Sequence, residues 1–268
     1  MAKAPTSENR YTAIARKIFL DRYRGGAKDV AFEREDIEKT ATKLKIDLPK
    51  NLGDLIYAIR YRMAMPEEIV ATQPKGMEWV IEGTGRACYS FKLVRINHIV
   101  PNGELVTVKI PDATPEIISA YALDDEQALL AKVRYNRLVD IFLGITSYSL
   151  QNHLRTAVKG IGQIEIDEIY VGVDSRGRQY IIPVQGKGGQ VDRLSVVQTK
   201  QDILYCQSKF PQLVCRALSA QFMPDEVIAM FELIVDDGQA KIVEERHYCL
   251  VPSMDIDIQD LKTYGRGR

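Results

Sequence analysis

The chain has 268 residues, enough for one or two domains, and its 36 Lys+Arg residues are balanced by 36 Asp+Glu residues. Apolar residues make up 46% and charged residues 27%, which is typical of a globular protein and excludes a disordered, collagen-like or polybasic chain. No apolar run approaches the roughly 18 residues of a membrane span, and residues 1–10 lack the apolar core of a signal peptide. We therefore expect a cytoplasmic protein with no membrane partner.

The cysteines predict free thiols and no zinc site. They are far apart in the sequence, and no CxxC motif is present. A zinc site needs ligands at short spacing, so we expect reduced, mostly buried side chains at these positions. The four are Cys88, Cys206, Cys215 and Cys249.

The overall neutrality hides an uneven distribution of charge. Residues 1–100 carry 18 Lys+Arg against 13 Asp+Glu, and residues 151–200 carry 7 against 5. Residues 101–150 and 201–268 are acidic, with 4 against 7 and 7 against 11. Because binding to a polyanion requires positive charge to be clustered, nucleic acid remains a candidate ligand in spite of the neutral total.

Residues 1–100 predict three helices followed by a β-hairpin. Apolar residues at helical spacing, the Gly25-Gly26 stop and β-branched and aromatic runs around a glycine-rich turn indicate these elements. This order is typical of a winged helix-turn-helix-like DNA-binding domain. The expected helices are Ser7–Tyr23, Arg34–Leu44 and one from Asn51 to the residue before Pro66, and the expected strands are Glu78–Ile81 and Tyr89–Val94.

In a winged helix-turn-helix domain the third helix enters the major groove of DNA. Its polar face would carry the candidate DNA-binding residues, and Arg86 at the hairpin tip would lie over phosphate. The alternative is a small α/β domain on which these side chains form only a solvated face. The helix residues are Asn51, Tyr57, Arg60, Tyr61 and Arg62.

The rest of the chain predicts a connector and a second domain. In residues 101–123 the turn-forming stretches Pro101-Asn102-Gly103 and Pro111-Asp112-Ala113-Thr114-Pro115 flank a short strand, Glu104–Ile110. We therefore expect a linker before a domain over residues 124–268. A long helix is expected over Asp125–Phe142. A further helix over Ser147–Lys159 would present His153 and Arg155 to DNA.

The most informative stretch is a predicted β-hairpin over residues 162–189. Because side chains alternate along a strand, Glu165 and Asp167 share one face of the first strand, and Gln185 and Lys187 share one face of the second. A turn centred on Arg176 sets Asp167 opposite Gln185 and Glu165 opposite Lys187. The four polar side chains then converge on one patch, unless the register slips by one residue.

These residue types suit hydrolysis of a phosphodiester. The reaction needs a divalent metal that neutralises developing charge, and Mg²⁺ prefers one or two carboxylates supplemented by water and phosphate oxygens. Asp167 offers a carboxylate and Gln185 an amide oxygen, while Lys187 suits holding the attacking water. Further acids are available, and the choice among them stays open: Glu165, Glu126, Asp140 and, on the opposite face of the strand, Glu168.

Asp167, followed by a hairpin and Gln185-x-Lys187, resembles the active site of PD-(D/E)XK nucleases in the variant where Gln replaces the second acid. The resemblance covers about residues 120–225. It implies a mixed central sheet flanked by helices and Mg²⁺-dependent DNA cleavage. The implied metal ligands are Asp167, Gln185 and the carbonyl of Gly186, with Lys187 positioning the water.

The resemblance also implies a helix after the lysine strand and then another strand, for which Val191–Gln207 and Leu213–Phe222 are suitable. The chain departs from the motif in two ways. Ile166 replaces the usual proline, and Gln185 lowers the negative charge of the site, which increases the demand for another acid. A second hairpin, Val227–Val235 with Lys241–Val251, is expected to extend the sheet or form an interface.

The leading hypothesis is a type II restriction-class endonuclease acting on double-stranded DNA, as a homodimer and with a cognate methyltransferase encoded nearby. Two alternatives stay open. One is a repair or structure-directed nuclease. The other is a winged-helix DNA-binding regulator whose nuclease-like domain is inactive.

Overall fold

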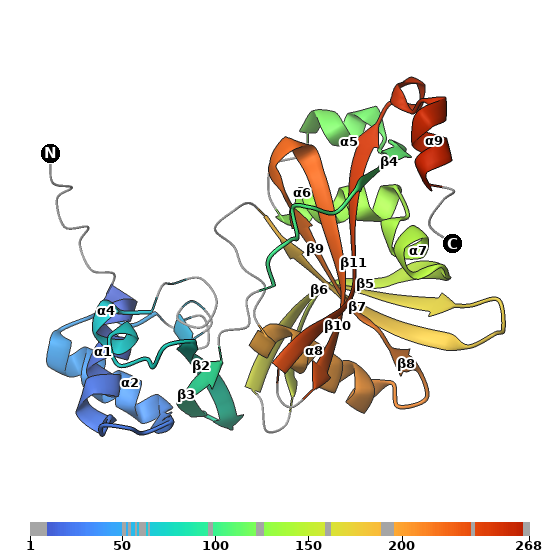
Figure 1. Ribbon diagram of the computed structural model, residues 1–268. Helices are drawn as coiled ribbons and strands as arrows, with labels where there is room; N and C mark the ends of the chain where they lie inside the picture. Colours follow the sequence, from blue (N-terminus) through green and yellow to red (C-terminus); the bar gives the residue numbers. More distant parts are fainter. Residues whose placement is uncertain are drawn as a thin grey trace, which may run out of the picture. The chain divides into compact units, whose positions relative to one another are not determined.

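The computed structural model describes residues 10–49, 52, 55–56, 58, 63, 65–95, 99–121, 126–158, 162–188, 196–236 and 239–264. The protein is mixed α/β and divides into two compact units (Figure 1). The first comprises Met1–Ile96 and Thr156–Gln163, and the second comprises Asn97–Arg155 and Ile164–Arg268. Among the described residues, no helix is both long and apolar enough to cross a membrane.

The first unit places helices beside a three-stranded antiparallel sheet of order β1-β3-β2. The expected hairpin is present. An unexpected strand, β1, pairs with β3 across Ala31 and Ser90. The described residues Leu52, Leu55, Ile56 and Ala58 are helical. The elements are α1 (Arg10–Arg22), β1 (Asp29–Glu33), α2 (Arg34–Leu44), α4 (Glu67–Val70), β2 (Met77–Gly85) and β3 (Cys88–Arg95).

Aromatic packing and a capping box organise this unit. The Phe19 ring meets the edges of Trp79 and Phe91, with ring centroids 5.0 and 5.2 Å apart, and all three side chains are buried. At the start of α2, the Glu33 N–H donates to the carboxylate of Asp36 at 2.7 Å, and a reciprocal bond completes the box. The helix therefore begins directly at the end of β1.

The second unit is built on an eight-stranded mixed sheet of order β4-β11-β10-β9-β7-β6-β5, with β8 beside β7. The helices are α5 (Glu116–Tyr121), α6 (Glu126–Tyr135), α7 (Leu138–Leu143), α8 (Val196–Lys209) and α9 (Ile258–Tyr264). The strands are β4 (Thr107–Pro111), β5 (Thr146–Val158), β6 (Gly162–Val173), β7 (Gln179–Lys187), β8 (Val214–Cys215), β9 (Ala217–Phe222), β10 (Val227–Asp236) and β11 (Gln239–Val251).

The β6–β7 hairpin has the register that the sequence predicts. Its antiparallel ladder runs from Val173↔Gln179 to Glu168↔Val184, in the frame that sets Asp167 toward Gln185. After β7 the chain passes through α8 and returns as β9, which pairs with β7 in parallel. The expected helix and following strand are therefore present, although the described helix starts at Val196. The second expected hairpin is also present as β10 and β11.

Helices α6 and α8 cover opposite faces of the sheet at β7 (Figure 1). A Cβ on Gly186 would lie 3.1–3.3 Å from Leu130 of α6, so that residue faces α6. The preceding residue, Gln185, is hydrogen bonded to side chains of α8. Because neighbouring residues of a strand face opposite ways, the two helices enclose β7 from both sides.

Two helix predictions were wrong. Residues 146–158 form strand β5, not a helix, because pairing with β6 at the edge of the sheet overrides a weak helical pattern. The long helix expected over Asp125–Phe142 is two helices. Arg137, with φ 52°, lies in the left-handed region and ends the regular turn between α6 and α7.

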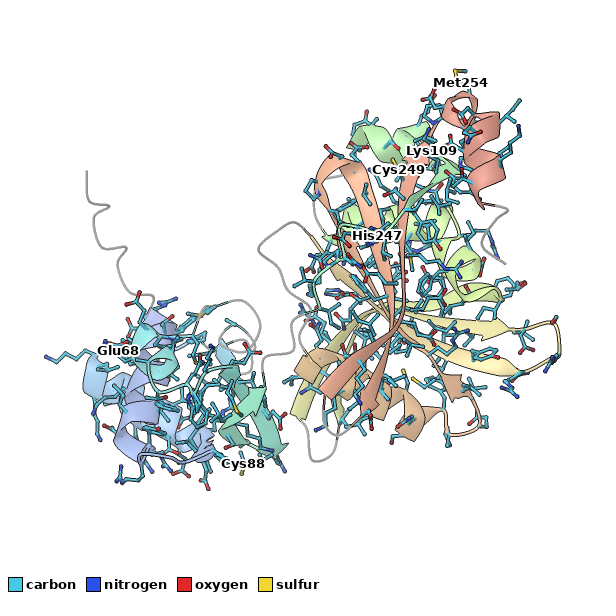
Figure 2. All side chains as sticks on the ribbon, viewed as in Figure 1. Glu68, Cys88, Lys109, His247, Cys249 and Met254 are labelled. Atoms are coloured by element: carbon cyan, nitrogen blue, oxygen red, sulfur yellow. The ribbon has the colours of Figure 1, made fainter. Side chains whose placement is uncertain are left out.

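Other segments add to the sequence-based description. The expected connector strand is β4, which starts at Thr107 and pairs in parallel with β11, and α5 and α9 were not anticipated. All four cysteines are free, as expected, but only Cys206 is buried. The others, including Cys88 and Cys249 (Figure 2), are half-buried, so the expectation of mostly buried thiols was wrong.

Candidate active site

The hairpin brings an acid and a lysine together where its ladder stops. Beyond the Glu168↔Val184 pair, the Gly186 N–H donates to Oδ2 of Asp167 at 2.9 Å. This bond fixes the Asp167 carboxylate beside β7, one residue before Lys187. The exposed fractions of Asp167 and Lys187 are only 7% and 9%, unusual for charged side chains.

Helix α6 contributes a second acid from the first turn of the helix. Oε1 of Glu126 accepts a hydrogen bond from Nζ of Lys187 at 3.1 Å. Glu126 is one of the acids that the sequence left open, and the structure places it at the lysine. The ion pair fixes the direction in which the Lys187 amine points.

Gln185 is held by a network of buried polar side chains on α8. Its Nε2 donates to Oδ2 of Asp202 at 2.7 Å and to the backbone oxygen of Glu165 at 3.4 Å. Its Oε1 accepts from Nε2 of Gln198 at 2.5 Å. The amide oxygen, expected to face a metal, is therefore already a hydrogen-bond acceptor.

Glu165 is buried between two basic side chains of β5. Its Oε1 lies 3.0 Å from Nε2 of His153 and 3.3 Å from Nη2 of Arg155. His153 has φ 54°, a strained conformation for a residue with a Cβ, which is common at functional sites. The two residues expected to contact DNA from a helix thus lie on a strand and contact a carboxylate of the candidate site.

The environment raises the pKa of two buried carboxyls of the site, Asp167 and Asp202. Burial raises the pKa of Asp167, opposed by the Gly186 N–H and the charge of Lys187. Burial also raises the pKa of Asp202 well above its ordinary value, and the negative charge of Asp167 adds to the effect. Carboxyls perturbed in this way cluster at functional sites.

The donor set fits a magnesium ion of the kind that the resemblance implies. Among the described residues, no three His, Cys, Asp or Glu side chains gather into a group that could hold a metal. Mg²⁺ requires only one or two carboxylates, because water and phosphate oxygens complete its shell. Asp167 supplies a buried carboxylate, and Oδ1 of Asp202 is a buried oxygen without a hydrogen-bond partner in the described chain.

Two of the alternative acids serve other contacts. Glu168, on the other face of β6, is ion-paired with Arg134 of α6 and accepts a hydrogen bond from the Tyr170 hydroxyl at 2.5 Å. Oδ1 of Asp140 accepts from the Ser147 N–H at 2.6 Å, at the start of β5. Neither carboxylate contacts the Asp167–Lys187 pair through a bond that the structure shows in its described part.

Among the candidate DNA-binding residues of the first unit, only Arg86 belongs to the part of the chain that the structure describes. Arg86 is exposed in the turn between β2 and β3, where the sequence places it. The candidates on the third helix, Asn51, Tyr57, Arg60, Tyr61 and Arg62, lie outside the described residues.

Sequence reasoning missed the contribution of α8. Gln198 and Asp202 are buried and lie four positions apart, one helical turn, so both face the sheet on one side of the helix. Polar residues at this spacing on a helix that packs against a sheet were the available signal. Thr199 and Gln201 beside them are also buried.

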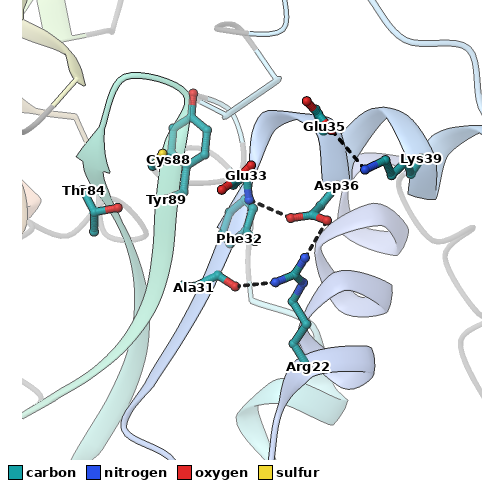
Figure 3. Close-up of a pocket in the computed structure, with 10 residues that line it drawn as sticks. All are labelled: Arg22, Ala31, Phe32, Glu33, Glu35, Asp36, Lys39, Thr84, Cys88 and Tyr89. Atoms are coloured by element: carbon teal, nitrogen blue, oxygen red, sulfur yellow. Dashed lines mark hydrogen bonds and ion pairs between the residues drawn. The ribbon is translucent and has the colours of Figure 1, made fainter.

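The first unit contains a pocket between α1, α2 and the sheet (Figure 3). Its polar side chains are bonded to one another: Asp36 binds Arg22 at 2.6 Å, and Lys39 binds Glu35 at 3.0 Å. These contacts stabilise the start of α2.

Comparison of the chain with protein-family models, curated proteins and solved structures found no match. Any functional conclusion therefore rests on the residues and their geometry.

Proposed function

We propose that the protein is a Mg²⁺-dependent endonuclease of the type II restriction class that hydrolyses phosphodiester bonds in double-stranded DNA. The observation that carries the proposal is the Gly186 N–H bond to Asp167, which puts this carboxylate next to Lys187 at the diverging end of β6 and β7. The surrounding order also agrees with the PD-(D/E)XK resemblance: β5, β6 and β7 are followed by α8 and by β9 parallel to β7.

Each residue of the site has a chemical task in this proposal. Asp167 and the carbonyl of Gly186 would hold the metal ion, which would neutralise developing charge and lower the pKa of water. Lys187 orients the attacking water and donates to the phosphate oxygen on which charge builds up. Glu126 acts through Lys187, because their 3.1 Å ion pair directs the amine.

The remaining groups support this arrangement. Gln185 joins β7 to the buried side chains of α8 through its amide. Glu165 adds negative charge near Asp167, and His153 and Arg155 limit that charge by pairing with it. Both basic side chains are about half exposed, which leaves them accessible to a phosphate of the DNA backbone.

We assign DNA docking to the first unit as a winged helix-turn-helix-like domain. The order helix, strand, helix, helical segment and hairpin, with β1 added to the hairpin beside β3, supports that assignment. Its wing carries Arg86. Because one site per chain cuts one strand at a time, concerted cleavage of both strands favours a homodimer, and a restriction role implies a cognate methyltransferase.

The test is cleavage of plasmid DNA by the full chain with Mg²⁺, compared with the variant Lys187→Ala. We expect discrete fragments from the wild type and a roughly 100- to 1000-fold lower rate from the variant, the usual cost of losing one transition-state donor. Lys241→Ala removes an exposed lysine of β11 and should leave the rate unchanged. Smeared products would favour a structure-directed or repair nuclease instead.

One observation favours a second candidate, a DNA-binding regulator with an inactive nuclease-like unit. The Gln185 amide oxygen, an expected metal ligand, is bonded to Gln198. This candidate predicts DNA binding with no cleavage in either Mg²⁺ or Mn²⁺. That result would overturn the endonuclease proposal.

A further inference from the structure

Asp202 of α8 is a buried carboxylate with an unused oxygen. The side chain is 2% exposed, and its Oδ2 accepts a hydrogen bond from Nε2 of Gln185 at 2.7 Å. Its Oδ1 is buried and has no hydrogen-bond partner in the described part of the chain. Burying a polar atom without a partner is costly unless a cation or donor compensates it when the site is in use.

The Gln185–Asp202 contact explains why residue 185 is an amide. An ionised carboxylate only accepts hydrogen bonds, so Gln185 turns its NH₂ group to Asp202 and its oxygen to Gln198. A glutamate at position 185 would oppose the Asp202 carboxylate at this distance, and two carboxylates so close cannot both ionise. Glutamine on β7 and aspartate on α8 are therefore complementary: any negative charge that the pair holds lies on α8.

Asp202 and Asp167 contact adjacent residues of β7. Oδ2 of Asp202 accepts from the side-chain amide of Gln185 at 2.7 Å, and Oδ2 of Asp167 accepts from the backbone N–H of Gly186 at 2.9 Å. The two aspartates thus contact β7 at neighbouring residues, one from β6 and one from α8.

We propose that Asp202 supplies the second carboxylate of the cation site, in place of the acid that β7 lacks at Gln185. The inference rests on the proposed metal-dependent function and adds a residue to it. Two carboxylates are within what Mg²⁺ takes from a protein, with water and phosphate oxygens filling the other positions. The unpartnered Oδ1 is the oxygen available to the cation.

The test measures cation binding directly. Mn²⁺ takes oxygen ligands as Mg²⁺ does, and electron paramagnetic resonance counts the free ion in the presence of the full chain. We expect Asp202→Asn to weaken Mn²⁺ binding by at least roughly tenfold, within the range seen when groups that support a metal site are removed. Asp167→Asn should abolish binding, and Glu116→Gln, which removes an exposed carboxylate of α5, should change nothing.

An exchange variant separates the charge from its position. Gln185→Glu combined with Asp202→Asn moves the carboxylate to β7 and keeps a donor–acceptor pair between the two side chains. We expect this double variant to recover most of the Mn²⁺ affinity and of the cleavage rate that Asp202→Asn loses. It also guards against misfolding, because it keeps hydrogen-bond partners for residues 198 and 202 and loses only the long bond to the backbone oxygen of Glu165. Circular dichroism on each variant checks the fold.

The possible results lead to different conclusions. If Asp202→Asn binds Mn²⁺ like the wild type while Asp167→Asn does not, Asp202 is a structural residue and only this inference fails. If Asp167→Asn also binds normally, the proposed site itself fails and this inference with it. A folded double variant that recovers neither affinity nor cleavage likewise counts against Asp202 as the second carboxylate.

Discussion

At the scale of single residues, two aspartates show how the environment decides whether a carboxylate stabilises the fold. Burial raises the pKa of Asp36, but the Glu33 N–H and the Arg22 guanidinium outweigh it and hold that pKa below the usual value. At Asp167 burial prevails over the Gly186 N–H and Lys187, and the pKa is raised. Asp36 therefore supports folding at neutral pH, whereas an ionised Asp167 costs stability, as is common for groups kept for chemistry.

The first prediction concerns Asp36. Because its folded-state pKa lies below the reference value of 3.8, its carboxylate stabilises the unit above that pH, and this contribution is lost as pH falls through the folded-state pKa. Asp36→Asn should lower the free energy of unfolding by about 1 kcal/mol at pH 7, because the amide oxygen can still accept from the Glu33 N–H but the charge that strengthens this bond and the pair with Arg22 is lost. The difference from the wild type should start to shrink below about pH 4 and disappear once the pH is below the folded-state pKa, where the wild-type carboxyl is itself protonated.

Urea unfolding followed by tryptophan fluorescence measures this effect selectively. The single tryptophan of the chain, Trp79, is 3% exposed in the core of the first unit. Glu35→Gln is the matched control, because Glu35 is an exposed acid of the same helix turn whose pair with Lys39 is solvated and should contribute little to stability. A pH-independent difference between Asp36→Asn and the wild type would show that the carboxylate charge is not the cause.

At the scale of elements, the alternation of side chains along a strand predicts a local hairpin from the sequence, but it does not predict which distant segments pair. The alternation around Asp167 and Lys187 gave the hairpin and its register, because a slip would expose a buried face. The segment over 146–158 was mistaken for a helix, since its strand conformation depends on β6. The contacts of Gln185 with Gln198 and Asp202 were missed for the same reason: they join a strand to a helix that lies beyond it in sequence.

Gly186 provides a prediction about how β7 and α6 fit together. A Cβ at this position would lie 3.1 Å from Cγ of Leu130, which is fully buried. Leu130 is one helical turn after Glu126, so relief of the overlap shifts the helix that directs Lys187. We expect Gly186→Ala to destabilise the second unit by roughly 1–3 kcal/mol, the usual cost of overpacking, and to lower the cleavage rate further than unfolding explains.

Thermal unfolding by calorimetry and the plasmid cleavage rate at a temperature where the variant is folded measure these two effects. Gly103→Ala is the control, because a Cβ there meets no atom within 4 Å and the residue lies in a loop. Equal stability of Gly186→Ala and Gly103→Ala would show that α6 accommodates the methyl group and that the packing argument is incorrect.

At the scale of the whole molecule, the neutral total charge predicts how DNA binding depends on salt. The basic residues are concentrated in residues 1–100, while residues 201–268 carry 7 Lys+Arg against 11 Asp+Glu. Few surplus cations are therefore available to neutralise phosphates. Because each phosphate contact releases condensed counterions, the number of contacts is read from the slope of log affinity against log salt.

The last prediction assigns one of these contacts to the hairpin of the first unit. Arg86 is exposed in the β2–β3 turn, and a phosphate contact there should be lost in Arg86→Ala. We expect weaker binding to every duplex sequence and a salt slope smaller by about 0.9, the value for one phosphate. Arg176→Ala should leave the slope unchanged. Arg176 lies in the exposed turn between β6 and β7, at the opposite end of that hairpin from Asp167.

Fluorescence anisotropy between 50 and 200 mM salt, with two unrelated duplexes, measures both slopes. Sequence-dependent losses in Arg86→Ala would mean that the arginine contacts bases, and an unchanged slope would remove the β2–β3 turn from the DNA interface.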